Sequence, residues 1–213
     1  MPRPALHLAA RVVNWPLTVL IRPYPRLNAL VWDLQYALGL WRYLDTSPDS
    51  GPLDLVRRHV PYPRILDLGC GTTANLALPP GRYRHYHGVD ISRAAIRRAR
   101  SLRRPDATFE VADVLRYRGT ETYDAILFRE VLYYFPPDQA VGLLLRAAGM
   151  LRPGGRILIW VYDTSSPTSQ ELVARIRDCG LVVHEESIDS VARRPAMTVV
   201  LGVPGPSPAG FAS

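Results

Sequence analysis

Lysine is absent from this sequence of 213 residues, although 26 of them are basic. Every basic residue is therefore an arginine, and against 19 acidic residues these give a formal net charge of +7. A basic balance is evidence about partners such as nucleic acids. A bias as complete as this one, however, is more typical of a GC-rich genome than of a surface selected to bind nucleic acid. The basic charge therefore does not by itself predict a nucleic-acid partner.

Cysteine is scarce, since only Cys70 and Cys179 occur. Neither has a partner at metal-ligand spacing, and two cysteines are too few for a disulfide framework. This scarcity predicts a reducing, cytoplasmic setting. The sequence carries no signal of the oligomeric state, which stays open.

Long apolar runs are missing too. The longest charge-free stretch near the start, residues 12–21, contains Pro16 and is about half as long as a membrane span requires. Polar residues interrupt the same region, which argues against a signal peptide. We expect a soluble protein without a membrane span.

The first 50 residues differ in composition from the remainder, because prolines divide them into short pieces, among them Pro2, Pro4, Pro16, Pro23 and Pro25. In one piece, apolar residues recur at helical spacing: Leu27, Leu30, Val31, Leu34, Leu38 and Trp41. This periodicity predicts an amphipathic helix over about 26–43. The helix could cover a sheet, or it could act as a lid that offers Tyr36, Trp41 or Tyr43 to a ligand. Binding to a membrane surface is disfavoured, because arginines do not line the polar face of this helix.

From residue 63 onward, segments typical of strands alternate with segments typical of helices. Strands are predicted at 64–68, 85–89, 108–111, 125–128 and 156–161, and helices at 92–102, 138–151 and 170–179. Pro153, Gly154 and Gly155 are expected to stop the second helix, and 181–186 with 197–203 resembles a hairpin. The alternation predicts an α/β, doubly wound, mostly parallel sheet of seven strands with a C-terminal antiparallel hairpin. We expect an N-terminal helical cap over 1–50, the sheet domain over 51–204, and a disordered tail over 205–213.

A glycine-rich loop follows the first predicted strand, in the order Asp67-Leu68-Gly69-Cys70-Gly71-Thr72-Thr73-Ala74. Glycines at this point let the backbone approach a ligand at the carboxyl edge of the sheet, where doubly wound folds bind. Gly69, Gly71 and Ala74 also satisfy the dinucleotide fingerprint, so NAD is an alternative ligand. Asp67 is expected to face the ligand, and a carboxylate suits a cationic amino group better than a pyrophosphate.

Carboxylates also follow the second and third predicted strands. Asp90 ends the second strand, where it can accept hydrogen bonds from ribose hydroxyls or cap the helix that begins near Ser92. Asp113 follows the third strand, where it can accept a hydrogen bond from an adenine amino group. Together these features indicate a nucleoside-containing ligand.

Five motifs in this order and spacing, DLGCGT, GVD, AD, LFREVLYYF and LRPGG, resemble those of the class I S-adenosylmethionine-dependent methyltransferase superfamily over about 60–165. Residues 36–44 resemble the helix that precedes the core in its small-molecule members. The resemblance implies a Rossmann-like fold and S-adenosyl-L-methionine as the cofactor. It implies a set of cofactor-binding residues: Tyr36, Trp41, Asp67, Gly69, Cys70, Gly71, Thr72, Asp90, Ile91, Ala112, Asp113, Val114, Arg129 and Val131. One residue departs from the pattern, since Thr73 stands where many members have a third glycine.

Methyl transfer from a sulfonium depends mainly on alignment of donor and acceptor, and aromatic faces favour the positive sulfur. The resemblance implies that Glu130 borders the acceptor as a base or an anchor; the alternative is an acid at a helix N-terminus or in a salt bridge. Tyr134 stands where some oxygen-methylating relatives carry a histidine, and it is expected to orient the acceptor. Because Tyr133 and Tyr134 also replace the acid and histidine of the metal-assisted subgroup, no metal is expected.

The expected function is transfer of a methyl group to a nitrogen or oxygen atom of a small molecule, in specialised metabolism. An RNA methyltransferase is an alternative, but base-amino methylation typically uses an Asn/Asp-Pro-Pro-aromatic motif where this chain has Arg129-Glu130-Val131-Leu132. A protein that binds the donor without methylating is another alternative. The arginines between 93 and 104 are expected to form a solvated helix face, and His85 and His87 are not expected to bind metal.

Overall fold

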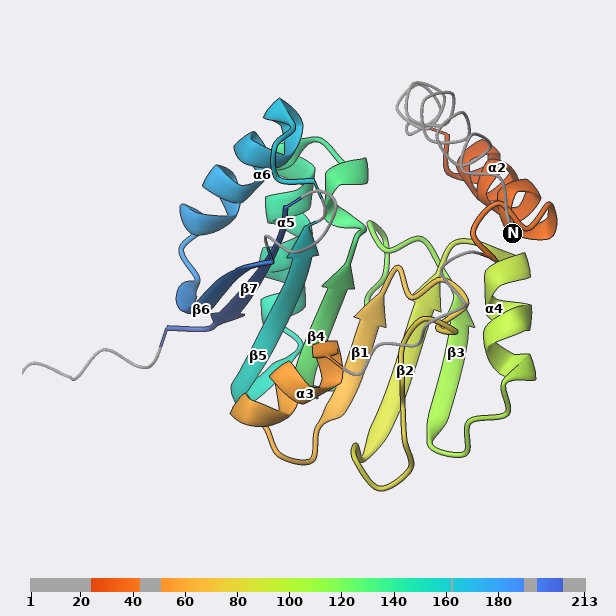
Figure 1. The fold of residues 1–213 in the computed structure, drawn as a ribbon, viewed down its shortest axis with the longest axis horizontal. Coiled ribbons are helices and arrows are strands. Elements are labelled where there is room, and N and C mark those ends of the chain that lie inside the picture. Colours follow the sequence, from red (N-terminus) through yellow and green to blue (C-terminus); the bar gives the residue numbers. More distant parts are fainter. Residues whose placement is uncertain (1–23, 43–50, 162, 190–194, 205–213) are drawn as a thin grey trace, which may run out of the picture.

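One seven-stranded sheet forms the centre of the computed structural model, which describes residues 24–42, 51–161, 163–189 and 195–204 (Figure 1). The strands are β1 (Arg64–Leu68), β2 (His85–Asp90), β3 (Ala107–Val111), β4 (Tyr123–Arg129), β5 (Leu151–Val161), β6 (Val182–Asp189) and β7 (Ala196–Gly202). Their order is β3-β2-β1-β4-β5-β7-β6. The first five run parallel, and β7 runs antiparallel between β5 and β6. The predicted α/β sheet with a C-terminal antiparallel hairpin is therefore confirmed.

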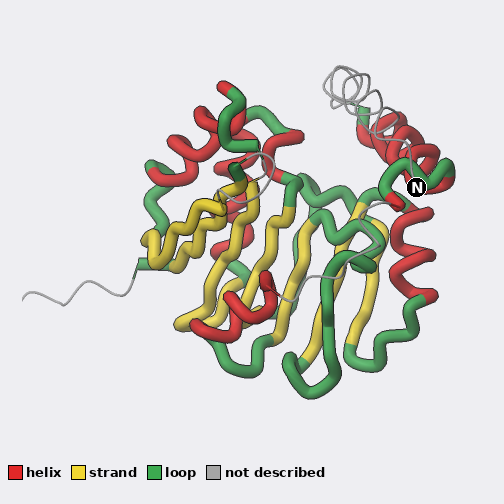
Figure 2. The backbone as a smooth tube through the Cα atoms, in the orientation of Figure 1, coloured by secondary structure: helices red, strands yellow, loops and turns green. Residues whose placement is uncertain are grey.

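Helices cover both faces of the sheet (Figure 2). They are α2 (Pro25–Ala37), α3 (Gly51–His59), α4 (Arg93–Ser101), α5 (Pro137–Ala148), α6 (Pro167–Arg177) and the short 3-10 helix η2 (Leu132–Tyr134). Because successive strand residues point to opposite faces, the buried strands supply two apolar layers. Under α5 and α6 the strand residues include Leu66, Ile126, Phe128, Ile157 and Ile159. Under α3 and α4 they include Ile65, Tyr86, Leu127, Leu158 and Val200.

Two elements differ from the sequence expectation. The helix α3 was not predicted, although Leu53, Leu55 and Val56 are buried and its charges complement the helix dipole, acidic first and basic last. The end predicted for the helix over 138–151 was wrong, since α5 stops at Ala148 and β5 already begins at Leu151. The Pro-Gly-Gly segment forms the irregular start of that strand, where the pairing with β4 shifts register.

The connection between β3 and β4 contains no helix. Parallel strands are usually joined by a crossover helix, but residues 112–122, all of which are described, form turns and coil. Part of the sheet face that α5 and α6 cover elsewhere therefore stays open at β2 and β3. A polar groove of about 790 Å³ lies there, and its lining includes His85, His87, Thr108, Glu110, Tyr117 and Tyr123.

The helix α2 does not cover the sheet with its apolar stripe, so that interpretation was wrong. Leu27, Leu30, Leu34 and Leu38 are 44%, 64%, 58% and 66% exposed. Polar and aromatic residues of the opposite face dock α2 instead, and it contacts α4 beyond the carboxyl end of β2 (Figure 1). The helix also ends at Ala37, before Gly39, which has a φ of +70°.

The remaining expectations about the ends of the chain fall outside the described residues. Tyr43, most of the cap over 1–50, and the tail over 205–213 belong to this part. Among the helices that are described, none has both the length and the apolar character of a membrane span.

Candidate functional site

The glycine loop after β1 is enclosed from two sides. Gly69 and Gly71 both have positive φ angles, of +83° and +57°. A Cβ atom on Gly69 would lie 2.6 Å from Cγ2 of Val131, and one on Gly71 would lie 2.8 Å from the hydroxyl of Tyr36. Both backbone conformation and space therefore require glycine here. The loop lies between the segment after β4 and the helix α2, and the cofactor-binding roles of Tyr36 and Val131 stay predictions.

Thr73 adopts the conformation that a third glycine would adopt. Its φ is +56°, which is unusual for a β-branched residue, and it is fully buried. Arg104 donates hydrogen bonds to the Thr73 hydroxyl (3.0 Å) and to the carbonyl of Leu76 (2.8 Å), and so fixes the loop. Arg100 likewise donates to the carbonyl of Phe109 (2.6 Å). The expectation that the arginine series is a solvated face was therefore wrong for Arg104, which is half-buried, whereas Arg100 is exposed.

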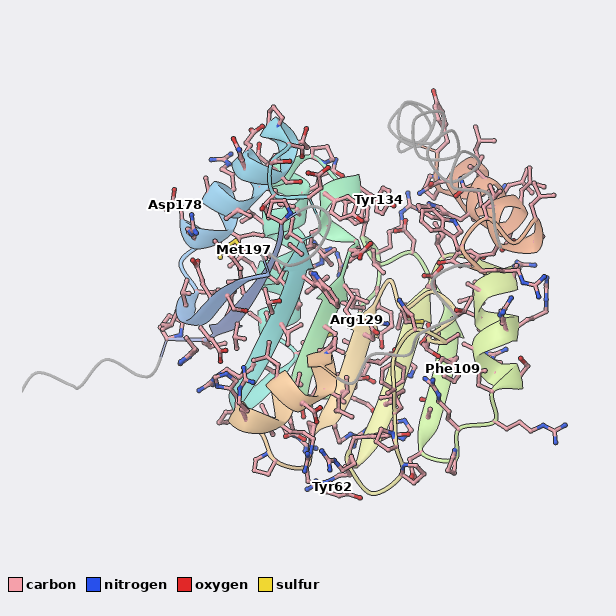
Figure 3. The ribbon with its side chains drawn as sticks, viewed as in Figure 1. Tyr62, Phe109, Arg129, Tyr134, Asp178 and Met197 are labelled. Atoms are coloured by element: carbon pink, nitrogen blue, oxygen red, sulfur yellow. The ribbon has the colours of Figure 1, made fainter. Side chains whose placement is uncertain are left out.

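Asp67 is completely buried at the end of β1 and paired with a cation. Its Oδ2 accepts hydrogen bonds from the Tyr86 hydroxyl (2.6 Å) and from Nε and Nη2 of Arg129 (3.1 and 2.9 Å). Burial lowers the pKa of Arg129, but the attraction of Asp67 outweighs this and raises it above its ordinary value. Oδ1 is buried and has no hydrogen-bond partner within the described chain. One oxygen is thus free to accept from a ligand, while Arg129 balances the charge at the centre of the sheet edge (Figure 3).

Asp90 is buried at the end of β2 with a different set of partners. Its Oδ2 accepts from the backbone N–H of Gly71 (2.9 Å) and its Oδ1 from that of Ser92 (2.8 Å). Burial raises the pKa of Asp90 to about 6, against the two backbone N–H groups, which lower it. A carboxylate offers about four acceptor positions, so both oxygens can still accept further hydrogen bonds. The helix cap is Ser92, whose hydroxyl accepts from Ala95 N–H (3.1 Å), and the alternative role of Asp90 as the cap was wrong.

Asp33 of α2 binds the start of α4, a contact that sequence analysis missed. Its Oδ1 accepts hydrogen bonds from the Ser92 hydroxyl (2.7 Å) and from the N–H of Ala94 (2.9 Å). A carboxylate at this point also complements the positive end of the helix dipole. The cap is thereby tied to the segment that directly follows Asp90.

Aromatic side chains from the cap and from η2 form one cluster. The Trp32 ring packs edge to face on Tyr134, with 5.1 Å between centroids, and its centroid lies 5.7 Å from that of Trp41. Trp41 donates a hydrogen bond to the buried Gln35 (3.1 Å). Tyr134 is the last residue of η2 and lies on the side of η2 that faces α2 (Figure 3). The sequence singled out Tyr134 and Trp41 but missed Trp32, although it lies one helical turn before Tyr36.

Glu130 begins the segment between β4 and η2 in a left-handed conformation, with a φ of +56°. Its N–H donates to the carbonyl of Trp160 (3.0 Å), and the Tyr133 hydroxyl donates to Glu130 Oε2 (3.3 Å). The following Val131 packs on Gly69. The structure thus brings Glu130 and the aromatic cluster to the edge that carries the glycine loop, and the catalytic roles of Glu130 and Tyr134 stay predictions.

The other predicted cofactor residues occupy the same edge. Ile91 follows Asp90, and the N–H of Ala112 donates to the Asp90 carbonyl (3.0 Å), which joins the ends of β2 and β3. Asp113 accepts from Leu115 N–H (2.9 Å) and lies half-buried, whereas Val114 is buried in the core under α5.

Cys70 and Thr72 turn their side chains to the protein. Burial raises the pKa of the Cys70 thiol, which packs against Gly88 in the core. Thr72 accepts from Ala74 N–H (3.3 Å). The backbone of these two residues is therefore what they present to a ligand.

Metal-binding geometry is not found within the described ranges, where no group of three or more His, Cys, Asp or Glu side chains is placed to hold an ion. His85 and His87 instead share the hydroxyl of Thr108, at 2.9 and 2.8 Å.

Comparison with known proteins gives consistent matches. The sequence profile of the family described as "Methyltransferase domain" matches residues 65–155. A trans-aconitate 2-methyltransferase of Deinococcus radiodurans is 30% identical over 115 residues, which span 53% of this chain and 43% of that relative. The match thus spans less than half the length of that curated relative.

Solved structures share the fold. The N-methyltransferase NodS of Bradyrhizobium japonicum, crystallised with S-adenosyl-L-homocysteine, superposes with a TM-score of 0.65 at 21% identity, over 83% of this chain and 98% of that one. Magnesium protoporphyrin IX methyltransferase of Synechocystis, with bound S-adenosylmethionine, gives a TM-score of 0.62 at 16% identity, over 81% and 95%.

Residues 65–155 therefore match the methyltransferase-domain family, and the chain shares the fold of S-adenosylmethionine-dependent methyltransferases, in agreement with the resemblance of the five motifs. S-adenosylmethionine is accordingly its cofactor, and the NAD alternative is set aside. The residues at the sheet edge fit this cofactor, because the narrow glycine loop, the free Oδ1 of Asp67 and the accessible lone pairs of Asp90 match an amino acid joined to a nucleoside.

Proposed function

We propose that this protein transfers a methyl group from S-adenosylmethionine to a nitrogen or oxygen atom of a small-molecule acceptor, in the cytoplasm and in specialised metabolism. The observation that carries the proposal is the contact of Trp32 with Tyr134, 5.1 Å between ring centroids. It joins the cap to the segment that carries Glu130, next to the loop where the superfamily binds its donor. A covered site of this kind excludes water and favours a compact acceptor over a long polymer.

Binding of the donor is assigned to the two buried carboxylates. When bound, S-adenosylmethionine supplies an electrophilic methyl group on a positively charged sulfur. Asp90 would accept hydrogen bonds from the ribose hydroxyls with the lone pairs that Gly71 and Ser92 leave free. Asp67 would accept from the amino group with Oδ1, while Arg129 keeps its other oxygen in place.

Alignment of the acceptor is assigned to the segment after β4. Glu130 would take a proton from an acceptor hydroxyl or anchor an acceptor amine, and the Tyr133 hydroxyl orients its carboxylate. Tyr134 would hold the acceptor against the cap, since its ring is already fixed by Trp32. The aromatic faces of this cluster favour a neighbouring cation, each by roughly 0.5–2 kcal/mol.

The test begins with mass spectrometry of small molecules that co-purify with the full chain, followed by a screen of amines, phenols and carboxylates with methyl-labelled donor. On the acceptor found, we expect Glu130→Gln to lower turnover by about a hundredfold or more, the lower end of general base catalysis. Binding of S-adenosylhomocysteine should stay within about twofold. Glu121→Gln, which changes an exposed acid at the opposite end of β4, is the matched control.

Two results would redirect the proposal. Label that enters RNA and no small molecule would favour the RNA methyltransferase alternative. Tight binding of S-adenosylhomocysteine without transfer to any acceptor would favour a protein that binds the donor and does not methylate.

A further inference from the structure

The exposed face of α2 is apolar. Successive residues of a helix turn by about 100°, so Leu27, Leu30, Leu34 and Leu38 lie within one arc of about 80°. All four are exposed, the least by 44% and the most by 66%. Contiguous apolar surface of this kind on a soluble domain marks a site of association.

Contacts on the opposite side of α2 prevent this face from turning inward. Asp33 accepts hydrogen bonds from Ser92 and Ala94 at the start of α4, and Trp32 packs on Tyr134. Rotating the helix to bury the leucines would break these contacts. The stripe is therefore held outward by the same residues that attach the cap to the site.

We propose that the leucine stripe of α2 docks on an anionic lipid surface, so that the protein binds membranes peripherally. Amphipathic helices bind there by burying an apolar face at the headgroup boundary, with basic residues beside it. Arg26 lies exposed at the edge of the stripe, and Arg93 and Arg97 are exposed on the adjoining α4. The formal net charge of +7 adds attraction to an anionic surface, and the charge-free run of residues 12–21 lies just before α2 in the sequence. Exposed arginines are thus present on α2 itself and on the helix that it contacts.

A bilayer suits this stripe better than a second copy of the chain does. A stable protein interface uses about 20–30 residues on each side, whereas four leucines on one helix form a narrow ridge. A bilayer needs no complementary shape, because acyl chains adapt to a ridge of this width.

The proposal also narrows the class of acceptor, and in this respect it rests on the proposed function. The stripe and the aromatic cluster occupy opposite sides of one helix, whose diameter is about 10–12 Å with side chains. An acceptor that is dissolved in the bilayer could therefore reach Tyr134 by moving around a single helix. We infer an amphiphilic acceptor with an apolar tail.

The experiment is co-sedimentation of the full-length protein with two kinds of vesicle, phosphatidylcholine alone and phosphatidylcholine with about 30% phosphatidylglycerol. We expect binding to the anionic vesicles at least about tenfold stronger, and a loss of about tenfold or more in Leu30→Gln/Leu34→Gln. Leu145→Gln, which changes a leucine of α5 that is 47% exposed, is the matched control and should bind like wild type. Arg93→Gln/Arg97→Gln should weaken binding to the anionic vesicles and leave the residual binding to neutral ones unchanged.

Three outcomes would overturn the proposal. The first is absence of binding, or equal binding to both vesicles. The second is a dimer in solution that Leu30→Gln/Leu34→Gln dissociates, since the stripe is then a contact between copies. The third is a fall in melting temperature of several degrees in this variant, since other residues of the chain then cover the stripe. Vesicle binding is measured without any acceptor, so it fails or succeeds independently of methyl transfer.

Discussion

The carboxyl ends of β1 and β2 each carry a buried aspartate, but the two environments differ. Asp67 faces a guanidinium and a tyrosine hydroxyl, and no part of it is exposed. Asp90 is held by two backbone N–H groups without a hydrogen-bonded basic side chain in the described residues, and burial raises its pKa to about 6.

The difference separates a carboxylate whose charge is balanced inside the protein from one whose charge is not. Removing a charge from water is costly unless a partner compensates for it. Arg129 compensates Asp67 permanently, whereas the charge of Asp90 lacks such a partner until a ligand supplies hydrogen bonds. We therefore expect loss of Arg129 at the β1 end to affect mainly folding, and loss of Asp90 at the β2 end to affect mainly donor binding.

The largest effect is expected from Arg129→Met. It would leave the charge of Asp67 buried and unpaired, which typically costs about 3–5 kcal/mol. The measurement is the free energy of unfolding in urea. Arg175→Met is the control, because the partner Asp138 is exposed and such pairs contribute roughly 0–1 kcal/mol. A loss at Arg129 no larger than that of the control would contradict the assignment.

Asp90→Ala should weaken binding of S-adenosylhomocysteine by about tenfold or more, because ribose hydroxyls lose a charged acceptor worth about 1.5–3 kcal/mol. Calorimetry on the folded variant measures this. Asp138→Ala, an exposed acid on α5, serves as the control. Unchanged affinity in the Asp90 variant would mean that another residue holds the ribose.

The pH dependence of donor binding should follow the pKa of Asp90. A carboxyl with a pKa of about 6 becomes protonated as the pH falls through 6, so affinity for S-adenosylhomocysteine should decline from pH 7 to pH 5.

The stability of the ligand-free protein should change with pH in the opposite sense. Because this pKa is raised above its ordinary value, the contribution of Asp90 to stability is full below about pH 4 and is lost as the pH rises through 6. The difference in unfolding free energy between wild type and Asp90→Asn, followed against pH, isolates this contribution; a flat difference would argue against it.

A smaller effect is expected from Asp33→Ala. Loss of a helix-capping acceptor costs about 0.5–2 kcal/mol, and the variant should also release the cap from the start of α4. Since the charge of Asp33 contributes to the raised pKa of Asp90, the midpoint of the pH profile for donor binding should move to lower pH. The melting temperature measures the loss of stability in this variant. An unchanged midpoint of the pH profile for donor binding would show that Asp33 does not influence the pKa of Asp90.

Treatment with EDTA should have no effect on turnover once an acceptor is known. The positions that carry an acid and a histidine in the metal-assisted subgroup are Tyr133 and Tyr134 here. Activity that EDTA abolishes and a divalent ion restores would contradict this expectation.

The sequence predicted features that depend on local pattern. Buried strands followed by glycine or aspartate gave β1, β2 and their ligand-binding ends, since strand periodicity and glycine punctuation are read within about ten residues. The ordered motifs extended this to the family resemblance, whereas the residues assigned to the donor site and the role of Tyr134 stay predictions. For these elements, tertiary packing reinforces the local preference.

Features that depend on pairing between distant segments were not predictable in the same way. The contact of Asp67 with Arg129 joins residues that are 62 positions apart, and nothing in either motif indicates which partner a carboxylate takes. Periodicity identified the apolar stripe of α2 but not the side on which the helix docks, which the polar contacts of Asp33 decide.

The left-handed backbone of Glu130 has a consequence for mutational screens. A non-glycine residue in this conformation destabilises the folded state by roughly 1–2 kcal/mol. Glycine would avoid this cost, although the greater conformational entropy that glycine gives the unfolded chain offsets part of the benefit. A library at position 130 selected for heat resistance alone should therefore enrich glycine. The same library selected for methyl transfer should reject glycine, because the carboxylate that Tyr133 orients disappears with the side chain. With the role that we propose for Glu130, selection for thermal stability and selection for turnover would therefore favour different residues at position 130.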